Sequence, residues 1–301
     1  MNLINNIEKL CSIHAPSGFE SMLIDYLIGW FANFIPNAVI DKTINNTLLI
    51  IKGQPKVVFI AHADSVGFIL QYNNKLLALG SPEVFEKTKL RTIDNFEVDI
   101  ESDQDENYYL KSNKTFERGT TFTFIPHFIE YENTIQSPYL DNRVGIALLM
   151  QLALESEHFC IVISSNEESC GGSIEKASRI LYEKYEICKS VIVDTTFHTE
   201  GIRMGDGVVL SLKDKYLPSE RWVSVVKNIL QKNNIPYQLE VEDVGSSDGA
   251  YIHKSPYPID WCFLGIACLN NHSEKEIVNI DDLNYLYDAI NYINKINMFN
   301  L

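Results

Sequence analysis

The stretch CIVISSNEESCGG, residues 160–172, begins as a continuous apolar run and ends with two adjacent glutamates, Glu167 and Glu168. Residues 142–156 before it and 171–185 after it repeat apolar side chains at three- and four-residue spacing, which predicts amphipathic helices. An apolar strand between two amphipathic helices is typical of an α/β sheet that helices cover on both faces. This stretch therefore decides the fold class.

The same alternation of strands and helices continues through the rest of the chain. Further elements are expected at residues 190–196, 218–234, 236–242, 261–269 and 281–296. The N-terminal part predicts two helices and then two β-branched runs, residues 46–52 and 56–62, joined as a hairpin through residues 53–55. We predict a mixed, largely parallel α/β sheet covered by helices on both faces.

A region of different texture interrupts this pattern. From about residue 66 to residue 127, short alternating segments are separated by Asn, Asp, Gly and Pro, which favours a small all-β unit. We therefore expect a main α/β domain made of residues 1–66 and 138–301, with an inserted small β domain at residues 67–137.

Composition narrows the class of protein. The chain has 301 residues, 46% of them hydrophobic, and a formal net charge of −15. Such an acidic balance argues against a nucleic-acid or anionic-membrane partner, because phosphate binding needs a basic face. The six cysteines contain no CxxC pair, so neither a disulfide framework nor a thiolate zinc site is expected. No secretion signal or long apolar span is evident, and we expect a cytoplasmic protein.

Acidic and imidazole side chains follow the expected strands or precede a helix. These residues are His62, Asp64, Asp141, Glu167, Glu168, Asp194 and His272. Singly, each has an ordinary explanation, since a lone Asp before a helix is usually an N-cap and paired glutamates are usually solvated. If the strand ends converge, however, unpaired carboxylates would repel one another, and a divalent cation removes that cost. Histidine with Asp and Glu suits zinc, with manganese or cobalt as alternatives.

The two glutamates are expected to have separate roles. One would ligate metal, and the other would stay free as a general base that activates a water molecule. One carboxylate can bridge paired metals, which together clamp the attacking and leaving oxygens of a hydrolysis. Alternation along a strand puts His62 and Asp64 on the same side, so Asp64 can accept the second ring N–H of His62 and fix its tautomer.

The ordered motifs resemble the dinuclear-zinc aminopeptidase family that includes glutamyl aminopeptidases and tetrahedral aminopeptidases, some of whose members carry an endoglucanase label. The similarity covers nearly the whole chain. It rests on APSGFE, DKTINNTLLIIKG, AHADSVGF, LDNRVG, NEESCGG, VDTT, GDG, GSSDGAYI and HSEKEIVNIDDL, in that order. No single motif is decisive, but the ordered set is specific.

The resemblance implies a metal-dependent aminopeptidase that holds two divalent ions per chain, zinc first, with cobalt or manganese as alternatives. It implies one ion on His62 and Asp194, the other on Glu168 and His272, a bridging Asp141, Glu167 as base, Asp64 as the residue that orients His62, and Asp248 near the substrate. It also implies a candidate cis peptide at Asp141–Asn142. The implied partners are short peptides and further copies of the chain, since family members often form dimers and dodecamers.

Two alternatives stay open at this point. Related dinuclear carboxypeptidases and deacylases use a similar site with a different pocket, so the fold alone does not fix the substrate. A non-catalytic relative is the other alternative, because Ser65 stands where the family commonly has Glu and the segment between residues 67 and 139 is short for the family. A metal-free glycosidase is disfavoured by the ligand-like histidines.

Overall fold

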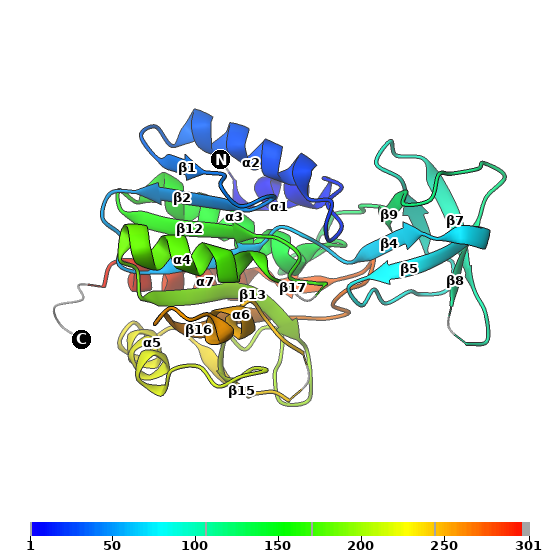
Figure 1. Cartoon of the computed structure of the whole chain (residues 1–301). Helices are drawn as coiled ribbons and strands as arrows, with labels where there is room; N and C mark the ends of the chain where they lie inside the picture. Colours follow the sequence, from blue (N-terminus) through cyan, green and yellow to red (C-terminus); the bar gives the residue numbers. More distant parts are fainter. Residues whose placement is uncertain (1, 106, 170, 244, 297–301) are drawn as a thin grey trace.

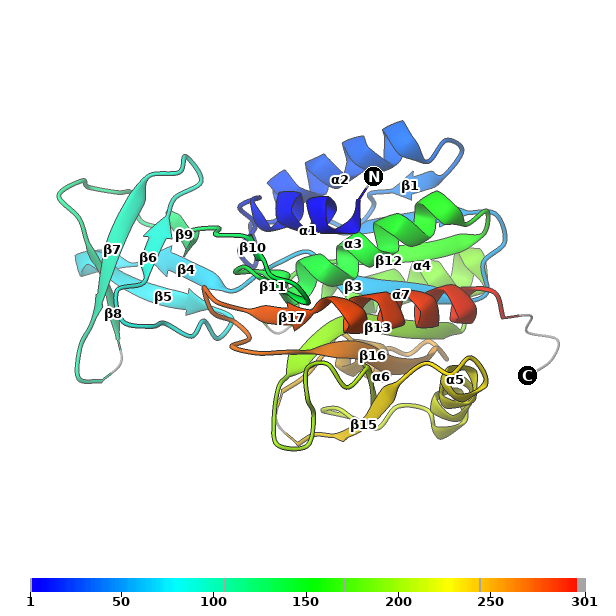
Figure 2. The same cartoon turned by 180° about the vertical axis from the view of Figure 1, so that it is seen from behind.

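The computed structural model describes residues 2–105, 107–169, 171–243 and 245–296. Its main body is built on an eight-stranded sheet (Figures 1 and 2). In spatial order the strands are β1 (Val39–Asp41), β2 (Leu48–Lys52), β12 (Phe159–Ser164), β3 (Val58–His62), β13 (Lys189–Phe197), β16 (Asp260–Cys268), β14 (Val208–Lys213) and β15 (Tyr237–Val241). The central strands β12, β3, β13 and β16 are parallel to one another, so the expected mixed, largely parallel sheet is confirmed.

Helices cover both faces of this sheet. They are α1 (Leu3–Cys11), α2 (Ser21–Phe34), α3 (Leu140–Glu155), α4 (Ser173–Tyr185), α5 (Glu220–Lys232), α6 (Gly249–Lys254) and α7 (Ile280–Asn294). Alternate residues of β12 enter two separate apolar clusters: Phe159 and Ile161 pack in the cluster with α1, α2, α3, α5 and α7, whereas Cys160 and Val162 pack in the cluster with α4 and α6. A strand buried on both faces reads as a nearly continuous apolar run, as this one does from Phe159 to Ile163.

The expected hairpin between residues 46–52 and 56–62 is wrong. Strand β2 pairs with β12 in antiparallel fashion, and β12 in turn pairs with β3, so β12 lies between the two. Strand β12 is buried at every position, and an inner place in the sheet gives its backbone a hydrogen-bonding partner on each side. The loop from Gly53 to Val57 reaches across, since five extended residues span about 17 Å and two strand spacings need only about 10 Å.

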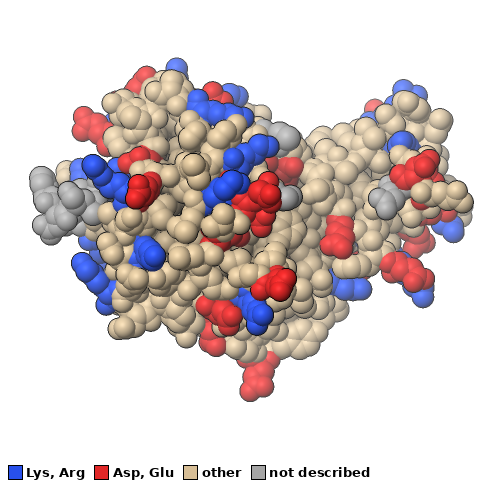
Figure 3. Space-filling view, turned by 90° about the horizontal axis from the view of Figure 1, so that it is seen from below, with Lys and Arg blue, Asp and Glu red and all other residues tan. Residues whose placement is uncertain are grey.

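The β unit forms a closed antiparallel barrel that projects from one end of the main body (Figures 1 and 2). Its strands, in order around the barrel, are β4 (Gly67–Leu70), β5 (Lys75–Leu79), β8 (Tyr108–Lys111), β7 (Glu97–Ser102), β6 (Lys89–Arg91) and β9 (Thr121–Phe124), with a short 3₁₀ turn, η1 (Tyr72–Asn74), between β4 and β5. Phe68, Leu90 and Phe122 fill its interior. Figure 3 shows the barrel as a separate lobe with acidic and basic side chains interspersed on the face in view.

The chain returns from the barrel through a small sheet that belongs to the main body. Strands β10 (Ile129–Glu130) and β11 (Thr134–Gln136) pair with each other, and β11 also pairs with β17 (Ile277–Asn279). The barrel itself thus spans Gly67–Phe124, within the stretch 67–137 assigned to the insert. Within the described ranges, no helix combines the length and the apolar character that crossing a membrane requires.

Candidate metal centre

The carboxyl ends of the central parallel strands meet along one edge of the sheet, where ligands commonly bind in open α/β sheets. His62 is the last residue of β3, Asp194 lies in β13, and Asp141 stands in the first turn of α3. The glutamate pair follows β12, and His272 follows β16. Strands far apart in the sequence therefore deliver the candidate ligands to one place.

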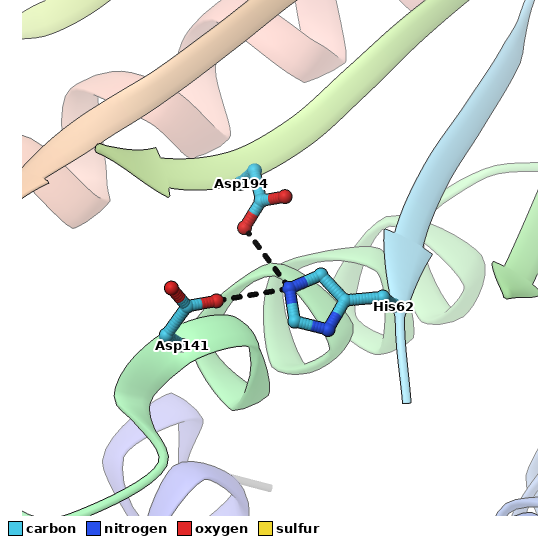
Figure 4. A group of neighbouring side chains, drawn as sticks. All are labelled: His62, Asp141 and Asp194. Carbon is cyan, nitrogen blue, oxygen red and sulfur yellow. Dashed lines mark hydrogen bonds and ion pairs between the residues drawn. The ribbon is translucent and has the colours of Figure 1, made fainter. Parts of the chain in front are cut away.

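The first group consists of His62 and two aspartates that lie near one nitrogen of its ring (Figure 4). The Nε2 atom of His62 lies 2.9 Å from Oδ1 of Asp141 and 3.4 Å from Oδ1 of Asp194. All three residues are buried. Figure 4 shows the two carboxylates, one from α3 and one from β13, turned toward the same nitrogen.

The second group uses the other oxygen of the same aspartate. The Nε2 atom of His272 lies 3.5 Å from Oδ2 of Asp141 and 3.3 Å from Oε2 of Glu168. In each group one candidate ligand atom from every residue falls within 4.8 Å of the others. The structure therefore brings together all five sequence-predicted ligands as two triads that share Asp141.

The protonation of this cluster reflects an excess of negative charge. Burial would lower the pKa of His272, but Glu168 and Asp141 raise it to about 10. Burial raises the pKa of Glu168 to about 8, against the opposing charge of His272. Burial likewise raises the pKa of Asp194 to about 6, although His62 opposes the shift. Without further cations, burial favours the neutral form of both carboxyl groups, and Glu168 is the one that keeps its proton at neutral pH.

The donor set fits divalent cations. Oε1 of Glu168 is buried and finds no hydrogen-bond partner among the described residues. Two imidazole nitrogens and the oxygens of three carboxylates are available, in a set without sulfur. Cys11, Cys160, Cys188, Cys262 and Cys268 are free thiols outside the two triads, and Cys170 lies outside the described residues. Nitrogen and carboxylate donors of this kind are typical ligands of catalytic zinc, manganese or cobalt.

Asp64 acts differently from the sequence expectation. The Nδ1 atom of His62 lies 3.1 Å from the main-chain oxygen of Asp64, within hydrogen-bonding distance, and 3.7 Å from its Oδ1. The carboxylate instead accepts hydrogen bonds of 3.0 Å from the backbone N–H groups of Glu167 and Glu168. Because β3 ends at His62, the strand alternation that would align the two side chains does not extend to Asp64.

Glu276 is a supporting residue that the sequence reasoning missed. Its Oε2 accepts a 3.0 Å hydrogen bond from the backbone N–H of Asp141, and its Oε1 accepts one of 2.9 Å from the backbone N–H of His272. The residue is 1% exposed, and burial raises its pKa well above the usual value. One buried carboxyl thus fixes the backbone of two candidate ligands. Its position four residues after His272 was the available signal.

A buried cation lies behind these supporting carboxylates. Arg143 is fully buried and donates a hydrogen bond from Nη1 to the main-chain oxygen of Ala63. Burial lowers the pKa of its guanidinium, and the anions that raise it include Asp64 and Glu276. Asp64 and Glu276, which hold the backbone of the candidate ligands, are thus among the acidic groups whose charge favours the buried guanidinium.

The start of α3 has the backbone geometry that the resemblance implied. The peptide bond between Asp141 and Asn142 is cis, as expected. The side chain of Asn142 donates to the main-chain oxygen of Val193 at 2.8 Å and accepts from the N–H of Gly145 at 3.0 Å. The bond to Val193 ties the segment that carries Asp141 to the strand that carries Asp194, and the bond from Gly145 fixes the amide of Asn142 within α3.

The triads open into a cavity of about 450 Å³. Glu167 lines it, and burial raises the pKa of this carboxyl well above the usual value, with Asp194 and Asp248 adding to the rise and His62 opposing it. Phe197 lines it too, with its ring edge-on to His272 at a centroid distance of 5.6 Å. Asp248 is 1% exposed and accepts a hydrogen bond from Ser164, while its neighbours Ser247 and Ala250 line the cavity. Asp248 therefore lies behind the residues that line the cavity and is not one of them.

Comparisons with known proteins agree with this architecture. Residues 81–288 match the model of the M42 glutamyl aminopeptidase family. A putative aminopeptidase of Acetivibrio thermocellus is 23% identical over 325 aligned residues, covering 94% of this chain and 96% of that protein.

Solved structures show the same fold. A TET aminopeptidase from a marine-sediment thaumarchaeote superimposes with a TM-score of 0.86 at 17% identity, covering 99% of this chain and 97% of that one. The TET1 peptidase of Pyrococcus horikoshii superimposes with a TM-score of 0.79 at 18% identity, covering 97% and 99%.

The family match spans well over half of the sequence, and the curated relative aligns along almost its whole length. The family resemblance seen in the sequence is thereby confirmed. The chain belongs to the M42 glutamyl aminopeptidase family and is a peptidase, a hydrolase that acts on peptide bonds.

Proposed function

We propose that this chain removes N-terminal residues from short peptides, with Glu167 as the general base of a dinuclear metal centre. His62 and Asp194 would hold one divalent ion, Glu168 and His272 the other, and Asp141 would bridge them. Zinc suits the donor set best, with cobalt or manganese as alternatives. When bound, the two ions would lower the pKa of a water molecule and polarise the carbonyl oxygen of the peptide.

Glu167 lines the cavity directly beside the candidate ligand Glu168 in the sequence and belongs to neither triad. Its backbone is fixed by Asp64, so its side chain is held beside the triads without belonging to either. Its carboxylate takes the proton of the attacking water and then gives it to the amine nitrogen of the leaving peptide. A carboxyl with a raised pKa is suited to both steps, since it can hold the proton between them.

The charge of the cavity wall favours an amino end over a carboxyl end of the substrate. Asp214, Glu240 and Glu242 line the cavity in addition to the site carboxylates, whereas Lys215 and Lys254 are its exposed lysines. An excess of carboxylates attracts the ammonium group of a peptide N-terminus and repels a C-terminal carboxylate. This observation supports an aminopeptidase rather than a carboxypeptidase.

The assembly of relatives supports a homo-oligomer. The Pyrococcus horikoshii TET1 peptidase, which shares this fold, can assemble into a tetrahedron or a large octahedral shell. We expect this chain to associate with further copies of itself, and light scattering on the purified protein measures the number of copies directly.

The observation that carries the proposal is the pair of triads joined by Asp141 with Glu167 left over beside them. The test is Glu167→Gln, which keeps the shape of the side chain and removes its basicity. We expect kcat on aminoacyl-arylamides to fall by about 10²–10⁴-fold, while metal analysis still finds two ions per chain. Glu175→Gln is the control, because Glu175 is exposed on α4 and lies outside both the cavity lining and the triads.

Three results would contradict the proposal. Retained turnover in Glu167→Gln would remove Glu167 from the base role. Hydrolysis of N-acyl amino acids by the wild-type protein, without hydrolysis of aminoacyl-arylamides, would show a deacylase instead. Wild-type protein that takes up no divalent metal would show a non-catalytic relative.

A further inference from the structure

The barrel contributes a side chain to the metal centre. Ser81 follows β5 of the barrel, and its Oγ lies 3.0 Å from Nδ1 of His272. The other ring nitrogen of His272 is the one that faces Asp141 and Glu168. The two nitrogens of this ring thus point to different parts of the molecule, one to the barrel and one to the centre of the site.

This contact has the geometry of a ligand-orienting hydrogen bond. A histidine that binds metal through Nε2 carries its proton on Nδ1, and that N–H normally donates to a fixed acceptor that sets the tautomer and the ring plane. For His62 this acceptor is the main-chain oxygen of Asp64, a residue of the main body. For His272 the acceptor is the hydroxyl of Ser81.

The backbone around Ser81 is tied to the same site. The N–H of Glu83 donates a 2.9 Å hydrogen bond to the main-chain oxygen of His272, and Glu83 forms a parallel bridge with Ser273. The two chain segments therefore run side by side, and the barrel segment fixes both the backbone and the ring of His272.

Gly80 brings the same segment against the other ligand of this triad. Its φ is +72°, and a Cβ built there would lie 3.2 Å from Cβ of Glu168 and 3.3 Å from its main-chain oxygen. Only glycine adopts this conformation readily and allows so close an approach. Residues 80–83 thus contact Glu168 and His272, the two ligands that belong to the second triad alone.

We propose that residues 80–83 of the barrel are a positioning element for the ion held by Glu168 and His272, with Ser81 fixing the ring of His272. This inference rests on the proposed dinuclear function. It predicts an asymmetry, because the barrel supports one triad while the His62–Asp194 triad takes its supporting contacts from the main body. A change in the barrel segment should loosen one ion and leave the other in place.

The test is Ser81→Ala in the full-length protein, with zinc binding measured by calorimetry or by equilibrium dialysis against a competing chelator. We expect one of the two zinc ions to bind about tenfold more weakly, at the lower end of the range for such supporting contacts because Ser81 is exposed and water can occupy its place. The other ion should keep its wild-type affinity.

Three further variants make the result specific. Ser81→Thr keeps the hydroxyl and should restore the affinity. Ser246→Ala removes another exposed serine of the same cavity, whose hydroxyl donates to the main-chain oxygen of Ser247, and should change neither ion. His272→Ala should lose the same ion, and adding Ser81→Ala to it should weaken binding no further, as two residues acting through one ligand require.

The outcomes separate this inference from the function beneath it. If Ser81→Ala binds both zinc ions with wild-type affinity, or loses affinity equally for both, the role of Ser81 is overturned while the dinuclear site stays intact. Wild-type protein that binds fewer than two ions would overturn the proposed function itself, and the inference with it.

Discussion

The backbone N–H of Glu167 donates a 3.0 Å hydrogen bond to the carboxylate of Asp64. The next N–H, that of Glu168, donates to the other oxygen of the same carboxylate, also at 3.0 Å. Asp64 is fully buried, so both bonds form away from water. One side chain thus holds the backbone of the proposed base and of a candidate ligand, and its own main-chain oxygen orients His62.

Asp64→Asn separates these two actions. The amide keeps one acceptor oxygen but presents an NH₂ group to the second backbone N–H, so one buried donor loses its partner. We expect the free energy of unfolding to fall by about 1–3 kcal/mol, measured by urea denaturation. Because the main-chain oxygen is unchanged, the ion at His62 and Asp194 should stay bound, while the ion at Glu168 weakens. Loss of the His62 ion instead would mean that the carboxylate orients the ring.

Arg143→Met tests the buried counter-charge. Methionine fills much of the same volume but removes the positive charge near Asp64 and Glu276 and the hydrogen bond to the main-chain oxygen of Ala63, and a hydrogen bond from a charged group is worth about 1.5–3 kcal/mol. We expect a loss of that order in urea denaturation and weaker zinc binding. Arg143→Lys, which keeps the charge, should lose clearly less stability. Equal losses in the two variants would show that Arg143 acts through its shape and hydrogen bonds alone.

His14 makes stability depend on pH. Its ring nitrogens lie 3.1 Å from Oγ1 of Thr123 and 2.9 Å from Oγ1 of Thr121, and it is 4% exposed. Burial lowers its pKa to about 4, and the nearby cations Arg91 and Arg143 add to the effect. In the unfolded chain the pKa of this histidine is near 6.5. As pH falls from about 6.5 to about 4, the unfolded chain therefore binds a proton at His14 while the folded protein does not.

Stability should therefore decrease with falling pH through this window, by about 3 kcal/mol from His14 alone. The measurement is the difference in urea denaturation between wild type and His14→Gln at pH 7.5 and at pH 5, since the carboxylates of the metal centre titrate alike in both. The wild type should lose more stability than the variant. An identical loss in both proteins would show that His14 takes up its proton without cost.

Much of the fold could be predicted because local pattern determines it. The apolar run that became β12 and the amphipathic repeat of α4 each carry their structure in neighbouring residues. The order of strands was missed, because nothing local in β2 says that its neighbour comes from residues 159–164 rather than 58–62. Strand β14 was also missed, although VVLSLK carries an apolar pattern of its own.

The site was predicted as far as residue type reveals chemistry. An imidazole or carboxylate at the end of an apolar strand or before a helix is unusual enough to notice, and the candidate residues were found in this way. The choice of five ligands among them and their grouping came from the family resemblance. Ser81 was missed because a serine beside glycine and proline in GSP looks like any turn residue. Its partner His272 lies 191 positions away in the sequence, and only the packing of the barrel on the main body brings the two together.

The parallel pairing of β13 with both β3 and β16 also determines at which stage of synthesis and folding the candidate ligands can come together. A chain still on the ribosome has His62 and Asp141 long before it has His272, and β16 must dock before that histidine reaches its neighbours. The proposed centre is therefore complete only after residues beyond His272 have emerged. Such distant pairings also slow folding, so maturation to an active enzyme should trail synthesis rather than accompany it.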